Sequence, residues 1–185
     1  MTNISFAAGI AVLLAGVGAP APAQTPPPPP PAAAKTSAMP YVAAAGASDQ
    51  FEIQSSQLAV SKSPNAATRK YAQMLIKHHT KTTAATVKAA KKAGMTPPPP
   101  ALDPGAAPSI AELQNAAATD FDRLYFGQQV PAHQAALDLH QSYARDGDQA
   151  ALRTSAKAAV PIVQQHLTGA QKMLDGAATG KMSGM

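Results

Sequence analysis

Apolar residues recur at helical spacing over four long stretches of this chain. In the first stretch, Val42, Ala45, Phe51 and Leu58 fall three to seven positions apart, which places them on or near one face of an α-helix. The later stretches carry the same pattern. It predicts an all-α protein with long helices over residues 41–62, 64–93, about 119–145 and 148–175, and it allows a short helix over 109–117.

Capping and turn-forming residues mark the boundaries of these helices. Ser63 is a suitable N-cap, and Pro64 fits the first position of the second helix, where its missing N–H costs nothing. Gly94, followed by prolines at 97–100, ends the second helix, and Gly147 ends the third. Each long helix therefore begins and ends for a local reason.

A long connection separates the second and third helices. At about 3.3 Å per extended residue, segment 94–118 is long enough to cross the full length of a bundle. Pro131 and Pro161 fall inside the third and fourth helices, where each removes a backbone hydrogen bond. We expect kinks rather than breaks, because the apolar pattern continues on both sides. The sequence thus predicts a four-helix bundle with a long connection between helices two and three.

Both ends of the chain differ in composition from the helical region. Residues 6–19 are apolar and small but too few to span a bilayer, and Ala21-Pro22-Ala23 suits a signal peptidase. A short membrane anchor is the alternative interpretation. We expect a signal peptide over 1–23, a disordered Pro/Ala-rich spacer over 24–40 with six successive prolines, a helical domain over 41–175 and a flexible tail over 176–185.

Composition narrows the chemistry. Hydrophobic residues make up 45% of the chain, only 4% are aromatic, and there is no tryptophan, so closely packed alanine-rich helices should form the core. The absence of cysteine excludes disulfides, a thiol nucleophile and a cysteine-anchored lipid. No GxSxG elbow, HExxH pair or phosphate-binding glycine loop occurs, which favours a protein that is not an enzyme.

Several short segments together resemble a known family. They are 46–59 with Glu52 near the centre, 71–81 with His78-His79, Phe121-Asp122-Arg123-Leu124-Tyr125 followed by His133, and Pro161 followed by His166. In this order, over about residues 41–175, they resemble the DUF4142 family. The resemblance implies an exported, ferritin-like four-helix bundle of the bacterial envelope, in the periplasm or associated with the outer membrane. His78, where the family usually has Asp, and Pro131 depart from the family pattern.

Four side chains that can bind a metal lie one on each predicted long helix: Glu52, His79, His133 and His166. If the first two helices meet near Ser63 and the long connection puts the start of the third helix at that same end, the four positions lie about 10 to 16 residues from that end. At about 1.5 Å per residue, they then fall within about 8 Å of one another along the bundle axis. Such a set could hold one divalent Zn, Fe, Mn or Cu ion. We expect no di-iron site, because the Glu-x-x-His pairs of that template are absent.

The alternative is a structural role, in which the four side chains stabilise the register of the bundle by hydrogen bonds to one another, to the backbone or to water. We expect the two other histidines near this level, His78 and His140, to be solvated, with His78 as a candidate outer ligand.

Charge suggests a second kind of function. The net charge is +5, and basic residues concentrate on the second helix at Arg69, Lys70, Lys77, Lys81, Lys88, Lys91 and Lys92. This face could bind an anionic membrane or cell-surface polymer in an envelope adaptor or stress protein, or it could simply keep the helix soluble. Nucleic acid is a poor partner for an exported protein without stacking aromatics. The sequence does not indicate an oligomeric state.

Overall fold

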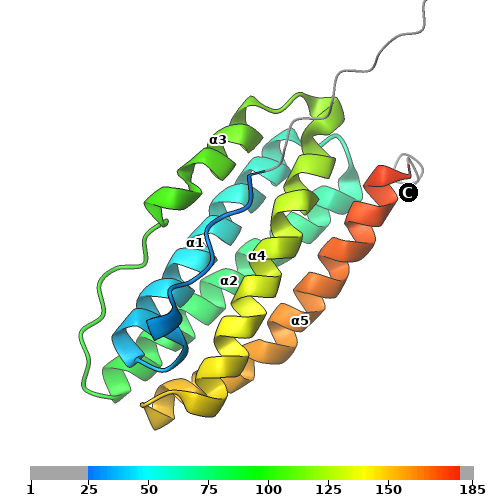
Figure 1. Ribbon diagram of the computed structural model, residues 1–185. Coiled ribbons are helices and arrows are strands. Elements are labelled where there is room, and N and C mark those ends of the chain that lie inside the picture. Colours follow the sequence, from blue (N-terminus) through cyan, green and yellow to red (C-terminus); the bar gives the residue numbers. More distant parts are fainter. Residues whose placement is uncertain (1–24, 180–185) are drawn as a thin grey trace, which may run out of the picture.

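The computed structural model describes residues 25–179, and this part of the chain is entirely helical (Figure 1). The all-α prediction is therefore confirmed for these residues. Two 3-10 turns accompany the helices, η1 at Ala32–Lys35 and η2 at Pro104–Ala106. The five α-helices are α1 (Ala38–Lys62), α2 (Ala66–Lys92), α3 (Ala107–Asn115), α4 (Ala118–Asp146) and α5 (Ala150–Ala178).

The four long helices lie side by side as a bundle (Figure 1). Helix α1 packs on α2 and α4, and α5 packs on the same two helices. The connection after α2 returns along the bundle, and α3 covers α1 and α4 before α4 begins. Hydrogen bonds from Ser63 and Thr68 to Asp122 show that α4 starts at the end where α1 meets α2. The long connection therefore crosses the bundle, as its length allows.

The predicted helix boundaries hold to within a few residues. Helix α2 begins at Ala66 rather than at Pro64, because Asn65 is its N-cap and accepts a hydrogen bond from the backbone N–H of Ala67 at 2.8 Å. Pro131 and Pro161 both lie within continuous helices, so neither breaks its helix. Helix α5 continues to Ala178, three residues beyond the predicted end.

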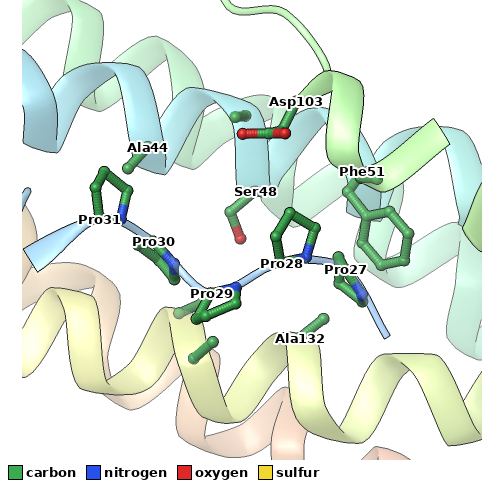
Figure 2. Close-up of a pocket in the computed structure, with 14 residues that line it drawn as sticks. Pro27, Pro28, Pro29, Pro30, Pro31, Ala44, Ser48, Phe51, Asp103 and Ala132 are labelled. Carbon is green, nitrogen blue, oxygen red and sulfur yellow. The ribbon is translucent and has the colours of Figure 1, made fainter. Parts of the chain in front are cut away.

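The proline segment differs from the disordered spacer that the sequence suggests. From Thr25 onward it packs on the helices, and Figure 2 shows Pro27 to Pro31 running between α1 and α4, where they line a pocket together with residues of both helices. Ser109 donates a hydrogen bond to the carbonyl of Thr25, and η1 buries Ala34 completely. A polyproline segment is extended before it packs, so docking it on alanine-lined helices costs little conformational entropy. The predicted signal peptide, and the tail beyond residue 179, lie outside the described residues.

Two apolar clusters fill the ends of the bundle. One contains Tyr41 and Tyr143, stacked with ring centroids 3.9 Å apart, and the other contains Phe121, Tyr125 and Phe126. These aromatic side chains supply volume that the alanines around them lack. Between the two clusters lies a layer of buried polar side chains, to which all four long helices contribute.

Candidate metal centre

The buried polar layer contains the four residues that the sequence singles out. Glu52 comes from α1, His79 from α2, His133 from α4 and His166 from α5, and none is more than 2% exposed. Each lies on its helix between residues of the two apolar clusters. The apolar ends exclude water from the layer, so any interaction between these side chains occurs at low dielectric.

Three imidazole rings converge in this layer. The ring centroids of His79, His133 and His166 lie 5.1 to 5.6 Å apart. One nitrogen from each ring falls into a group whose members are all within 4.8 Å of one another. Two nitrogen ligands on one tetrahedral zinc ion lie about 3.3 Å apart, so modest rotations of the rings would bring all three into coordination.

Each ring uses its outward nitrogen in a hydrogen bond. Nδ1 of His79 lies 2.7 Å from Oδ1 of Asp49, and Nδ1 of His133 lies 2.9 Å from the carbonyl oxygen of Gln129. Nε2 of His166 lies 2.8 Å from Nδ1 of His78. A carbonyl oxygen only accepts, so the Gln129 contact places the proton of neutral His133 on Nδ1 and the lone pair on Nε2.

The inward nitrogens have no partner. His79 Nε2, His133 Nε2 and His166 Nδ1 are buried without a hydrogen bond. Hydrogen bonding of the outward nitrogen to a carboxylate, a carbonyl or another acceptor is how proteins orient an imidazole that binds a metal. Each of the three rings is therefore oriented by a hydrogen bond at one nitrogen and has its other nitrogen unpaired in the buried layer.

Burial controls the charge of the cluster. It lowers the pKa of His133 to about 3 and that of His166 to about 2, and the neighbouring His79 adds to both effects. Burial also opposes protonation of His79, but the hydrogen bond and charge of Asp49, with the charge of Glu52, raise the pKa of His79 above its ordinary value. His133 and His166 are therefore neutral at pH 7, which is the form that binds a metal.

Glu52 lies beside the three rings rather than among them. Its Oε1 is 3.7 Å from Nδ1 of His133, and neither carboxyl oxygen has a hydrogen-bond partner. Burial raises the pKa of Glu52 to about 8, although the charge of His79 acts in the opposite direction. At neutral pH in the metal-free protein, Glu52 is thus mostly a protonated acid.

Asp49 is a site residue that the sequence pattern did not single out. Besides contacting His79, it accepts hydrogen bonds from the hydroxyls of Thr82 and Thr83. It precedes Glu52 by three residues and therefore lies on the same face of α1, which is the one signal available in the sequence. Its carboxylate orients His79 and supplies negative charge behind the cluster.

The prediction that His78 and His140 are solvated is wrong for His140 and only partly right for His78. His140 is 5% exposed, and its Nδ1 lies 3.0 Å from the hydroxyl oxygen of Tyr41. His78 is half-buried and contacts His166, so it backs a candidate ligand.

The basic residues of α2 are mostly on the surface. Arg69 is half-buried and donates a hydrogen bond to the carbonyl of Ser63 at 2.8 Å, so it serves the turn between α1 and α2. The lysines are all exposed, namely Lys70, Lys77, Lys81, Lys88, Lys91 and Lys92. A partner could therefore reach the lysines but not the full guanidinium of Arg69.

The described residues thus form an all-helical bundle with a buried cluster of three histidines. The chain belongs to the family described as "Domain of unknown function (DUF4142)", which matches residues 23–173. This confirms the resemblance seen in the sequence. No curated protein and no solved structure gives a significant match. Within residues 25–179, no helix is both long and apolar enough to cross a membrane.

Proposed function

We propose that this protein binds one divalent first-row transition metal ion through His79, His133 and His166, with Glu52 as the adjacent fourth group. The observation that carries the proposal is the set of three buried inward nitrogens without partners. A ferritin-like four-helix bundle is the finer fold class that we propose, supported by the four long helices and the connection from α2 to α4.

A purely structural role explains the outward nitrogens but not the inward ones. Leaving a buried polar atom unpaired costs about 1 to 3 kcal/mol. Three such atoms, together with the two oxygens of Glu52, lie in one layer of the bundle. A single cation would satisfy the three nitrogens at once and would also favour ionisation of a neighbouring carboxyl group.

The donor set indicates which ions fit. Imidazole and carboxylate ligands suit Zn, Fe, Mn and Cu, whereas Mg and Ca prefer sites made of oxygen ligands. The positions three residues before the histidines are Ile76, Val130 and Val163, so the carboxylates of a di-iron centre are missing there. The proposal is therefore a site for one ion and not iron storage.

Metal titration of the purified full chain tests this proposal. We expect Zn²⁺ to bind with a stoichiometry near one per chain and to raise the melting temperature, since a ligand that binds only the folded state stabilises it. Co²⁺ bound by three histidines and a fourth group should give the intense visible absorption of a four-coordinate complex. Mg²⁺ is the matched ion control and should leave the melting temperature unchanged.

Variants locate the ion. His133→Gln should abolish the Zn²⁺-dependent rise in melting temperature, whereas His140→Gln removes a buried histidine outside the cluster and should retain it. If neither Zn²⁺, Fe²⁺, Mn²⁺ nor Cu²⁺ changes the melting temperature of the wild-type protein, the proposal is wrong. That measurement needs no variant, so it decides the matter even if His133→Gln fails to fold.

Export to the envelope is a separate proposal, which rests on residues 1–23. The exposed lysines of α2 support a second candidate function, salt-sensitive binding to an anionic membrane or surface polymer. Sedimentation with anionic vesicles at rising salt tests it, and unchanged binding after neutralising the α2 lysines would contradict it.

A further inference from the structure

A groove of about 650 Å³ lies between α2 and α5, away from the buried histidine layer except at one end. That volume is within the range of small-molecule binding sites. His78 and Ile162 line the end of the groove near the histidine layer, and Lys92 and Ala151 line the opposite end. Helices α2 and α5 run in opposite directions (Figure 1). The residues that line the groove come from both helices, so the groove follows the seam between them.

Small side chains account for this groove. Ala85 and Ala89 of α2 face Ala151, Ala158 and Ala159 of α5 across it. Methyl groups cannot fill the space between two helices at ordinary separation, so the seam stays open and its floor is apolar. An alkyl chain lying in the groove would bury its apolar surface against these alanines, which favours binding.

Charge is distributed unevenly around the groove. Lys81, Lys88 and Lys92 form its α2 side, while Thr154 and Ser155 contribute hydroxyls from α5. No acidic residue is among the described residues that line it. Lys88 and Lys92 are one helical turn apart, so both ammonium groups can reach a single anionic group.

We propose that this groove binds an amphiphilic carboxylate, a molecule with one acid group and an unbranched alkyl chain. The acid lies between Lys88 and Lys92, and the chain follows the alanine floor toward Ile162. Along α2, the distance from Lys92 back to Lys81 is about 16 Å at 1.5 Å per residue, which accommodates an extended chain of about a dozen carbons. The site does not depend on the proposed metal.

The placement of the lysines favours this occupant over a flat anionic surface. A bilayer would meet the outward lysines of α2, such as Lys70 and Lys77, at least as readily as those in the groove. A concave apolar floor adds nothing to that interaction, whereas it buries an alkyl chain. Binding to a bilayer therefore depends on Lys70 and Lys77 as well, whereas binding of an alkyl carboxylate depends on the lysines that line the groove.

Calorimetry with dodecanoate below its micelle concentration tests the proposal on the full chain. Dodecanol and dodecylammonium, which have the same chain length, should bind at least about tenfold more weakly, because neither carries the negative charge that pairs with the two lysines. The double variant Lys88→Gln/Lys92→Gln should lose about tenfold or more in affinity. The matched control Lys70→Gln/Lys77→Gln changes the net charge equally and should bind as the wild type does.

Ala158→Phe provides an independent check on the floor. Residue 158 is exposed and lines the groove, so a phenyl ring there should block the alkyl chain without disturbing the core. Equal affinity for acid and alcohol, equal losses in the two lysine variants, or unchanged binding by Ala158→Phe would each overturn the proposal. Affinity for anionic vesicles that falls equally in both lysine variants, without dodecanoate binding, would assign the lysines to a membrane surface instead.

Discussion

Glu52 offers the sharpest test of the electrostatics of the buried layer. Its pKa is raised from 4.5 to about 8 in the folded protein, so between these two pH values the folded state holds a proton that the unfolded state has lost. The folded state then binds more protons than the unfolded state, and stability falls as pH rises through this window. Glu52→Gln removes the titrating group and with it this loss.

The size of the effect follows from the proton count. One proton per molecule corresponds to about 1.4 kcal/mol per pH unit. From pH 6.0 to 7.5, inside the window, the free energy of unfolding of the wild type should therefore fall by about 2 kcal/mol relative to Glu52→Gln. Contributions from titrating groups that do not interact with Glu52 are shared by both proteins and cancel in the difference. His79 does interact with Glu52, whose charge raises its pKa, so these two groups titrate together.

Urea unfolding of the two metal-free proteins at several pH values measures this difference. A constant offset between the curves reports the packing cost of the amide, whereas a change of the offset with pH reports the proton. Parallel curves from pH 6.0 to 7.5 would refute the reasoning, because they would mean that Glu52 is ionised in the folded protein.

Two further predictions concern the support around the site and the turn before α5. Asp49→Asn should weaken Zn²⁺ binding by about 10 to 100-fold in calorimetry, because the carboxylate behind His79 is lost; unchanged affinity would show that His79 needs no such support. Gly147→Ala should lower the free energy of unfolding by about 1 to 3 kcal/mol, because a Cβ there would overlap the ring of the buried Tyr143; a neutral result in urea unfolding would show that this ring can move freely.

The sequence predicts the helices well because their signals are local. Helical spacing and the glycines and prolines at the boundaries depend on a few neighbouring residues, and the observed ends agree to within a few positions. The proline segment is the exception. Its extended conformation is local, but its docking depends on α1 and α4 lying side by side, which happens only when distant parts of the chain meet.

The candidate site divides in the same way. Counting residues from the turn between α1 and α2 brings His79, His133 and His166 to one level of the bundle, and the structure confirms that they converge. Counting does not reveal rotation about each helix. The rotation of each helix about its own axis places Asp49, rather than Glu52, within hydrogen-bond distance of His79. It also turns the side chain of His140 into the core, where it contacts Tyr41.

By itself, therefore, the sequence determined the family, the all-helical class and which level of the bundle carries the histidines. These depend on order, spacing and composition, which a linear chain displays directly. Only the tertiary structure decided which histidine nitrogens are hydrogen-bonded and which are left unpaired in the buried layer. It also decided where a groove stays open between α2 and α5. Those properties depend on helix rotation and side-chain packing between residues far apart in the chain, where small differences in volume decide the contacts.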